Sequence, residues 1–459
     1  MKIATLALLG CLAGPALLAQ ENHSEYMEGP FSSPQEVTET CLLCHDGIDQ
    51  DIMKTRHWNW LGDAHATADG TQVRRGKQNV INNYCIGLDS NWPRCTSCHI
   101  GYGWSDNSFD FTDGKNIDCL VCHDRSGTYK KTPTGAGLPD PSVDLARAAQ
   151  SVGPTGNQNC GFCHFDGGGG TGVKHGDLDG SMLQPSAQLD VHMGKLGFTC
   201  SDCHAGENHQ IRGASHGSLA TGTNHISCLD CHDERPHEMR VINNHTASLA
   251  CETCHIPAFA REEPTKVWWD WSTAGQDKKV PVDEFGKETY DKKKGDFVWA
   301  MNVVPAYAWH NGQADYYSLG EPVDPSKPLP LNRLAGSLED PGSKISPFKV
   351  MKGKQIYDAG AKCLVVPKLY GPGGYWQTYD WNGAAKLGME ENGLTYSGSH
   401  GFVETTMHWP INHMVAPAED ALKCTACHHT DPARSRMDWE GLGYGSDPMR
   451  SGGRLNFDE

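Results

Sequence analysis

The chain has few apolar residues and a deficit of positive charge. Hydrophobic residues make up 38% of its 459 positions and 52 are glycine, which is little material for a conventional core in a chain of this length. Lys and Arg number 39 against 56 Asp and Glu, so the formal net charge is -17. Nucleic acids and anionic membranes are bound by positive surfaces, so neither is expected as a partner. Beyond the N-terminus no segment approaches the roughly 20 apolar residues that span a bilayer, so we expect no transmembrane segment in the mature chain.

Cysteine, by contrast, is abundant and regularly placed. Sixteen of the 19 cysteines fall in eight repeats of Cys-x-x-Cys-His, numbered here as motifs 1 to 8 in chain order. At this spacing two thiols add across the vinyl groups of a haem, and the adjacent His ligates its iron. Zinc also takes paired cysteines with His, but zinc sites combine two half-motifs and need no His directly after every second Cys. The sequence therefore predicts eight haem c groups. In motif order, the predicted attachment cysteines are Cys41 and Cys44, Cys95 and Cys98, Cys119 and Cys122, Cys160 and Cys163, Cys200 and Cys203, Cys228 and Cys231, Cys251 and Cys254, and Cys424 and Cys427, and the predicted iron ligands beside them are His45, His99, His123, His164, His204, His232, His255 and His428.

Haem macrocycles would supply the apolar surface that the composition lacks. We therefore predict a multihaem cytochrome c that is mainly α with much irregular loop, with eight covalently attached haems forming its core. Lys2 followed by an apolar run to Leu18 is typical of an export signal, which would place the mature chain in the periplasm. The predicted divisions are a signal peptide at 1–19, an N-terminal arm at 20–40, a seven-haem region at 41–255, a haem-poor segment at 256–423, and the eighth haem with a C-terminal tail at 424–459.

The haem-poor segment is the clearest change along the chain. A protein that only transfers electrons has little need for a long segment without haem motifs. We therefore interpret this segment as a lid, a substrate channel or a subunit contact, and the alternative is a purely structural role. A hairpin is expected around residues 285–287 and a helix from Tyr375 toward Met389. Cys363 lies here outside every motif, and a disulfide between it and the other lone thiol of the mature chain, Cys85, is one expectation for an oxidising compartment.

Second iron ligands would have to come from histidines outside the motifs. The chain has 23 histidines, eight of them in motifs, and the other fifteen exceed the further ligands that eight irons need. His57 stands among tryptophans, whose flat rings can wall a haem, but each candidate also has a plainer interpretation as a packed or surface His. Counting alone does not separate an enzyme from an electron wire. The predicted second ligands are His57, His65, His192, His216, His225, His245 and His413.

Four stretches outside the motifs resemble the octahaem tetrathionate reductase family of periplasmic cytochromes c. They are residues 56–60 (Arg-His-Trp-Asn-Trp), 82–85 (Asn-Asn-Tyr-Cys), 173–177 (Val-Lys-His-Gly-Asp) and 409–413 (Trp-Pro-Ile-Asn-His), and the eight motifs have about the same spacing as in that family. The resemblance covers nearly the whole mature chain. It implies reduction of tetrathionate, nitrite and hydroxylamine, and a haem arrangement related to hydroxylamine oxidoreductase and pentahaem nitrite reductase.

One haem of that family has a lysine at its iron, with a cysteine and an asparagine beside it. Carried onto this sequence, these are the motif 2 haem with Lys174, Cys85 and Asn82. On composition alone the glycine-rich stretch 166–172 is a flexible loop and Lys174 is a solvated side chain. The resemblance instead makes Lys174 an iron ligand, which requires its amine to be neutral.

The sequence also departs from the family pattern. The family carries an acidic residue a few positions before the lysine, whereas this chain has Thr171, and its nearest carboxylates are Asp166 and Asp177. The source of protons at the site is therefore open. No Cys-x-x-Cys-Lys motif is present, which argues against the octahaem and pentahaem nitrite reductases that use that variant.

The predicted function is a periplasmic octahaem c-type cytochrome reductase. It would reduce tetrathionate, nitrite or hydroxylamine at a lysine-ligated haem supplied by seven haems with two His ligands each. The substrate would be a small inorganic anion or nitrogen compound held in a local basic pocket, and the electron donor a periplasmic or membrane-anchored cytochrome or quinol dehydrogenase. The alternatives are a non-catalytic electron-transfer cytochrome and an enzyme that oxidises hydroxylamine or hydrazine on the same scaffold.

Overall fold

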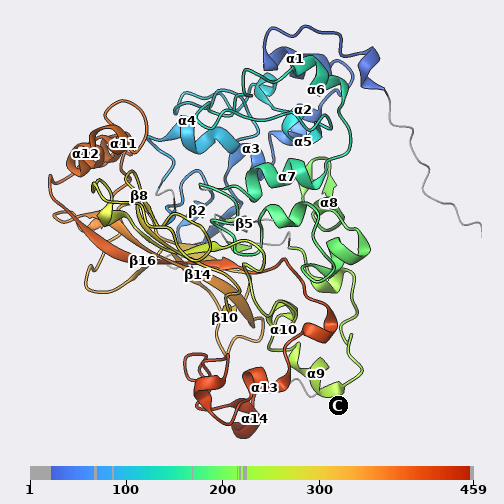
Figure 1. The fold of residues 1–459 in the computed structure, drawn as a ribbon, viewed down its shortest axis with the longest axis vertical. Helices are drawn as coiled ribbons and strands as arrows, with labels where there is room; N and C mark the ends of the chain where they lie inside the picture. The colour runs from blue at the N-terminus through green and yellow to red at the C-terminus, as the bar shows by residue number, and fades with distance from the viewer. Residues whose placement is uncertain are drawn as a thin grey trace, which may run out of the picture.

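Two parts make up the structure, a computed structural model that describes residues 22–66, 70–84, 87–167, 169–213, 215–216, 219–220 and 225–454. The predicted signal peptide lies outside these residues. Short helices and loops that carry the haem motifs run from the top to the bottom of the view in Figure 1, and an extended sheet lies against their middle. The α-helices are α1 (Pro34–Leu42), α2 (Ile48–Ile52), α3 (Arg56–Asn59), α4 (Trp92–Cys95), α5 (Leu120–His123), α6 (Leu145–Gln150), α7 (Asn157–His164), α8 (Cys200–Cys203), α9 (Arg240–His245), α10 (Cys251–His255), α11 (Tyr375–Thr378), α12 (Trp381–Glu391), α13 (Cys424–Cys427) and α14 (Pro448–Ser451).

Each haem motif lies in, or directly after, a short helical turn. Helix α1 leads into motif 1, for example, and α7 contains motif 4. Residues three apart on a helix share a face, so the two thiols of each motif point the same way. The first turn of α1 is built conventionally, since Ser33 caps it and accepts the backbone N–H of Glu36 at 3.3 Å. The haem-bearing part is thus many short helices joined by loops.

The haem-poor segment forms an eight-stranded sheet, the largest regular element of the described chain. Its central strand is β14 (Lys344–Asp358), which pairs antiparallel with β16 (His400–Pro410) and in parallel with β7 (Thr265–Asp270). The order across the sheet is β12, β16, β14, β7, β9, β8, and β10 and β15 also pair with β14. The remaining strands of this sheet are β8 (Tyr290–Asp291), β9 (Gly295–Ala300), β10 (Ala306–His310), β12 (Leu329–Pro330) and β15 (Cys363–Leu364). The two-stranded ribbons pair β1 (Ala64–Ala66) with β2 (Gln72–Arg74), β3 (Gly206–Glu207) with β4 (Gln210–Ile211), β5 (Ser215–His216) with β6 (Leu219–Ala220), and β11 (Ala314–Tyr316) with β13 (Asn332–Leu334).

The sheet and the haem-bearing part share one apolar core. Its main cluster joins Trp269 and Trp409 of the sheet to Tyr84 and Val173, which lie before motif 2 and after motif 4. The ring of Tyr84 meets those of Trp269 and Trp409 edge to face, at centroid distances of 6.1 and 5.4 Å. Burial of such large aromatic rings is a major source of stability, so the sheet helps to hold the loops that approach motif 2.

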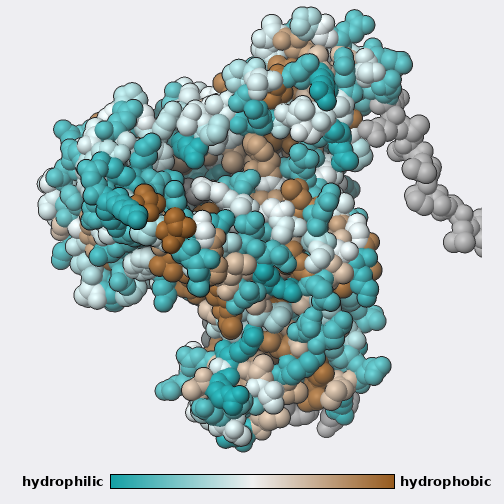
Figure 2. All heavy atoms as spheres, viewed as in Figure 1, coloured by the Kyte–Doolittle hydropathy of each residue, from teal (hydrophilic) through white to brown (hydrophobic). Residues whose placement is uncertain are grey.

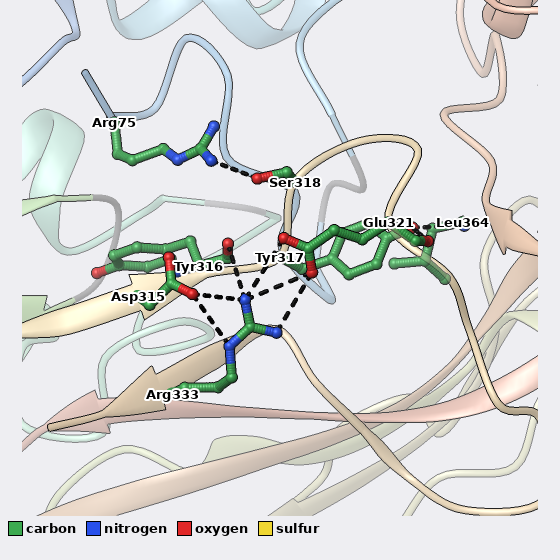
Figure 3. A network of polar contacts seen from close by, with 8 residues as sticks. All are labelled: Arg75, Asp315, Tyr316, Tyr317, Ser318, Glu321, Arg333 and Leu364. Atoms are coloured by element: carbon green, nitrogen blue, oxygen red, sulfur yellow. Dashed lines mark hydrogen bonds and ion pairs between the residues drawn. The ribbon is translucent and has the colours of Figure 1, made fainter. Parts of the chain in front are cut away.

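A polar network makes a second connection between the two parts (Figure 3). Arg333 lies 2.6 Å from Asp315 and 3.3 Å from Glu321, within the haem-poor segment. Close to this network, Arg75 donates a hydrogen bond to Ser318 of the same segment. Because Arg75 belongs to the stretch that leads to motif 2, this contact fixes that stretch against the haem-poor segment.

One local prediction is confirmed, and two features differ from expectation. A turn at residues 283–287 lies in the expected hairpin and closes with a 3.0 Å hydrogen bond from Asp283 N to Lys287 O. The helix expected from Tyr375 is divided into α11 and α12, because Tyr379 has a left-handed φ of 52° and Asp380 caps a new helix. The multihaem fold predicted as mainly α has many helices, all short, and it also contains a sheet that was not expected from the sequence.

The surface is hydrophilic over most of the face in Figure 2, and apolar side chains show in small patches, the clearest of them over the sheet. None of the helices in the described ranges is long and apolar enough to cross a membrane.

Candidate haem sites and candidate active site

A continuous cavity of about 3320 Å³ runs through the haem-bearing part and reaches the inner side of the sheet. A pocket for one small ligand typically measures about 300–1,000 Å³, so this cavity has room for several large cofactors. The cysteine pairs of motifs 1 to 7 all line it. A large space bordered by repeated thiol pairs and histidines is what a row of covalently attached haems requires, so the residues fit the predicted cofactor.

Seven of the eight motif histidines face a second histidine at ring-centroid distances of 6.0 to 6.4 Å. A metal–imidazole bond is about 2 Å long, so two rings on opposite sides of one metal have centroids roughly 6 Å apart. The spacing is therefore that of two axial ligands with an iron between them. The facing pairs are His45 with His23, His123 with His209, His164 with His57, His204 with His413, His232 with His192, His255 with His237, and His428 with His245.

Motif 2 differs from the other seven. His99 is fully buried among aromatic rings, including those of Trp60 and Trp104 at 5.3 and 4.8 Å, and no second histidine ring faces it among the described side chains. Its Nε2 lies 2.7 Å from the carbonyl oxygen of Trp58, and its Nδ1 has no hydrogen-bond partner. Burial lowers the pKa of His99 to about 3, so the ring is neutral. Ligation of an iron through Nε2 of His99 would require this nitrogen to give up its contact with the Trp58 carbonyl.

Thiols of different motifs lie against one another and define a sequence of attachment points. Side-chain contacts join motifs 1 and 3, motifs 2 and 4, motifs 4 and 5, and motifs 6 and 7. The thiols of three further pairs of motifs lie close enough for their charges to interact, namely motifs 3 and 4, motifs 5 and 6, and motifs 7 and 8. The attachment points therefore form the series 1, 3, 4, 5, 6, 7, 8, with motif 2 joined to motif 4. The contacting thiols are Cys41 with Cys119, Cys98 with Cys163, Cys160 with Cys200, and Cys228 with Cys251.

Two lysines line the cavity beside motif 2. Lys174 is half-buried and follows the glycine-rich loop after motif 4, where a Cβ on Gly167 would lie 3.6 Å from Lys174 Cδ. Lys77 points its ammonium at the ring of Trp60, with Nζ 3.8 Å from the centroid. Lys77 is exposed to the open cavity, but the protein atoms around its ammonium lower its pKa; the thiol of Cys98 opposes this shift, and the charge of Lys174 adds to it. Motif 2 thus has a local basic pocket in a chain whose net charge is -17.

The other predicted site residues near motif 2 are only partly described. Asn82 lines the cavity, and its Oδ1 accepts the backbone N–H of Tyr84 at 2.9 Å. Cys85 lies outside the described residues. Its suggested disulfide partner, Cys363, is a free thiol buried at the end of the sheet. The structure therefore brings Asn82 and Lys174 to one cavity, whereas the role of Cys85 stays a prediction.

The carboxylates near Lys174 have separate surroundings. Asp177 is buried and accepts the backbone N–H groups of Asn412 and His413 and the Nδ1 of His413, at 2.8, 3.0 and 3.0 Å. These bonds lower its pKa although burial acts to raise it. Thr171 accepts the backbone N–H of Gly180 at 3.0 Å. Asp166 lines the cavity, and burial raises its pKa. Asp177 is therefore engaged in hydrogen bonds with His413, whereas Asp166 faces the cavity.

Among the predicted second ligands, His57, His192, His245 and His413 face motif histidines. The ring of His225 instead lies against Gly312, where a Cβ would be 3.2 Å from it. His65 and His216 lie on β1 and β5, and their side chains are outside the described part of the chain. Three further histidines that were not predicted from the sequence also face motif histidines, namely His23, His209 and His237. His209 and His237 each follow a motif His by five residues, a spacing that could have marked them, although each faces the His of a different motif.

Comparison with solved structures settles the family. A crystal structure of an octahaem cytochrome c from Shewanella oneidensis is 49% identical in sequence, with a TM-score of 0.89, and the match covers 95% of this chain and 100% of that one. This chain belongs to the octahaem cytochrome c family. The predicted resemblance to the tetrathionate reductase-like octahaem cytochromes is thereby confirmed, as is the multihaem cytochrome c fold.

Two family profiles also match this octahaem cytochrome. One, described as bacterial cytochrome c, covers residues 266–431, and another, described as cytochrome c7 and related cytochrome c, covers residues 186–261. A protein of Archaeoglobus fulgidus, described as uncharacterized, is 25% identical over 241 residues, which is 41% of this chain and 80% of that protein. The first profile covers most of the sheet, so the haem-poor segment is itself part of a cytochrome c family.

Proposed function

We propose that this octahaem cytochrome is a reductase whose active centre is the motif 2 haem, with Lys174 as its second ligand. The observation that carries the proposal is that seven motif histidines face a second histidine, whereas His99 faces none among the described side chains and its motif adjoins two lysines. When bound, the haems would carry electrons, and the motif 2 iron would offer a site for substrate. Two His ligands would fill both ligand positions of an iron, so the other seven haems are suited to electron transfer, whereas a substrate at motif 2 would have to displace the Lys174 amine or His99.

The order of thiol contacts supports delivery of electrons to motif 2. Cys98 of motif 2 contacts Cys163 of motif 4, whose partner Cys160 contacts Cys200 of motif 5. Haems attached at these points would be close neighbours. Motif 4 would therefore be the point from which electrons reach the active centre.

The basic pocket suits an anionic or nitrogen substrate. Lys77 places positive charge beside motif 2, which attracts tetrathionate or nitrite despite the negative charge of the whole chain, whereas the amine of Lys174 would be neutral as an iron ligand. Asn82 would donate a hydrogen bond to a bound oxygen or nitrogen. Because Asp177 is committed to His413, Asp166 is the other nearby carboxylate for the protonation of nitrite or hydroxylamine.

For tetrathionate, Cys85 would act as a nucleophile. Its thiolate attacks one central sulfur, forms a Cys–S–S–SO₃⁻ adduct and releases one thiosulfate. Two electrons then cleave the new S–S bond, which restores the thiolate and releases the second thiosulfate. Sulfur atoms and charge balance in both steps.

Location and partners form the last part of the proposal. The apolar N-terminal run supports export to the periplasm, where c-type haem is attached in bacteria. The electron donor would be a periplasmic or membrane-anchored cytochrome or quinol dehydrogenase.

Spectroscopic titration tests the active centre. Nitrite or hydroxylamine added to the oxidised protein should shift the optical and electron paramagnetic resonance signals of one haem in eight. Lys174→Ala should remove the amine-ligated signal and lower nitrite reduction at least tenfold, with the other seven haems unchanged. Eight low-spin haems that ignore both ligands would contradict the proposal and identify an electron carrier.

The thiol step is tested separately. Cys85→Ala should abolish tetrathionate reduction but leave nitrite binding at the motif 2 haem, and Cys363→Ala is the matched control. Full tetrathionate activity in Cys85→Ala would exclude the nucleophile. A disulfide between the two cysteines in the non-reduced protein, seen by mass mapping, would also do so.

A further inference from the structure

Lys349 of β14 is a fully buried lysine that contacts the backbone of the proposed ligand. Its Nζ donates to the carbonyl oxygens of Val173 and Lys174, at 2.9 and 2.8 Å, and to the hydroxyl of Thr265. The hydroxyl of Tyr84 donates to the same Lys174 oxygen at 3.2 Å. The backbone next to the Lys174 side chain is therefore held from both sides, by the sheet and by the loop before motif 2.

The hydrogen-bond pattern identifies the charge state of Lys349. Thr265 gives its hydroxyl proton to the carbonyl of Gly172 at 2.6 Å, so it can only accept from Lys349. Three acceptors around Nζ require three N–H groups, which only the ammonium form has. Burial holds the pKa of Lys349 well below its ordinary value, and the charge of Lys266 acts in the same direction, while the charge of Asp177 opposes both. The ammonium form therefore rests on the three acceptors around Nζ. Hydrogen bonds from an ammonium are about twice as strong as neutral ones, so this contact is well suited to fix a loop.

The same strand also holds the other side of the site. Gln355 Nε2 donates to the carbonyl of Asn82 at 3.2 Å, and Asn83 Nδ2 donates to the carbonyl of Met351 at 2.9 Å. Lys349, Gly353 and Gln355 are spaced by even numbers, so they lie on one face of β14. This face of the sheet thus binds the Asn82 loop and the Lys174 loop together.

We propose that Lys349 is a positioning residue that sets Lys174 on the motif 2 iron, and that β14 aligns the two loops of the active centre. This inference rests on the proposed function, since it takes Lys174 to be the ligand. Gly169, Gly170 and Gly172 have positive φ angles, so the loop before Lys174 has a backbone of unusual freedom. Without Lys349, the carbonyls of Val173 and Lys174 would lose their charged donor. The loop could then change conformation and displace the Lys174 side chain.

The test is the Lys349→Met variant of the full-length protein with its haems attached. Methionine keeps the unbranched apolar stem and removes the three donors. Near-infrared magnetic circular dichroism of the oxidised protein should show loss or a shift of the amine-ligated haem band, with the bands of the seven histidine-ligated haems unchanged. Nitrite reduction should lose at least tenfold in kcat/KM.

Lys266→Met is the matched control. Lys266 is also a buried lysine of the sheet, on β7, but its Nζ lies over the rings of Phe297 and Trp269, at 3.3 and 4.4 Å from their centroids. This variant should keep the amine-ligated band and the activity, even if it is less stable. A purely structural role of Lys349 would make the two variants alike.

Tyr84→Phe keeps the inference falsifiable if Lys349→Met does not fold. It removes only the second donor to the Lys174 carbonyl, so it should shift the same band and lower kcat/KM less than Lys349→Met. A folded Lys349→Met protein with an unchanged band and activity would overturn the inference. If only Tyr84→Phe folds, an unchanged band and an unchanged kcat/KM in that variant would overturn it as well. Absence of an amine-ligated haem in the unmodified protein would overturn the proposed function, and the inference with it.

Discussion

Asp177 and His413 form a buried pair in which Asp177 Oδ2 lies 3.0 Å from His413 Nδ1, and His413 in turn faces His204 of motif 5. A carboxylate on the far nitrogen of an axial imidazole makes that ring a stronger donor to its metal. If His413 ligates the motif 5 haem, Asp177 would therefore tune that haem, although it lies three residues from Lys174.

Asp177→Asn should raise the reduction potential of the motif 5 haem, because the imidazole would donate less electron density to ferric iron. It should also lower the free energy of unfolding by about 1–3 kcal/mol, since buried N–H groups would lose a charged acceptor. A spectroelectrochemical titration measures the first effect and urea unfolding the second. Asp179→Asn is the control, because Asp179 is equally buried but accepts from Ser181. Equal potentials in both variants would contradict the prediction.

The angles between facing imidazole planes predict two classes of electron paramagnetic resonance signal. Parallel planes separate the energies of the iron d orbitals and give rhombic spectra, whereas perpendicular planes leave them nearly equal and give a single signal at large g. The planes meet at 13° to 21° for motifs 1, 5 and 7, and at 68° to 84° for motifs 3, 4, 6 and 8. Spin quantitation of the oxidised protein should therefore give three rhombic haems and four large-g haems. A different ratio would show that the ligand pairs are assigned wrongly.

The buried ion pair beside motif 2 should be important for stability. Lys131 Nζ lies 2.9 Å from Asp118, with both side chains at most 1% exposed, and it also donates to the carbonyl of His99. Lys131→Met would leave a buried carboxylate without its cation, at a cost of about 3–5 kcal/mol in the free energy of unfolding. Lys115→Met, which breaks an exposed pair with Glu39, should cost about 0–1 kcal/mol. Urea unfolding distinguishes the two, and similar losses would argue against the buried pair.

Gly353 should tolerate no side chain. A Cβ there would lie 3.2 Å from Asn83 Cβ and 3.4 Å from the carbonyl oxygen of Trp269. Gly353→Ala should therefore destabilise the protein by about 1–3 kcal/mol and displace the Asn82 loop, which would lower nitrite reduction. At Gly445 a Cβ would meet nothing within 4 Å, so Gly445→Ala should have little effect on either measurement.

Intact mass should show eight covalently bound haems on the exported chain, one for each motif. Replacement of both Cys424 and Cys427 by Ser should remove one haem and the large-g signal assigned to motif 8. The motif 2 centre should then still bind nitrite, because motif 8 lies at the far end of the series. Loss of more than one haem would show that motif 8 is needed for maturation of the others.

The attachment chemistry could be predicted from the sequence because it is local, whereas the second ligands could not. Each motif needs only five consecutive residues, but His413 faces His204 from 209 positions away, and His57 faces His164 from 107 positions away. The prediction for His225 stays untested, since its ring lines the cavity beside Gly312. Only the path of the chain around the cavity decides which ring faces which.

The sheet was missed for a related reason. Strand β14 lacks a clean alternation of apolar and polar residues, because it is central and both its faces are largely covered. It also contains Pro347, Gly353 and four lysines, residues that are depleted in strands. One of those lysines is Lys349, whose contact with the Lys174 loop has no signature in the local sequence.

The junction of motif 2 with motif 4, rather than with either end of the series, creates two arms of unequal length. Motifs 3 and 1 lie on one side of the junction and motifs 5 to 8 on the other. Electrons that arrive at one end could fill both arms before a substrate molecule binds. The haems would then act as a reservoir beside the active centre, and a reaction that consumes several electrons could run to completion without waiting for a new encounter with the donor at each step.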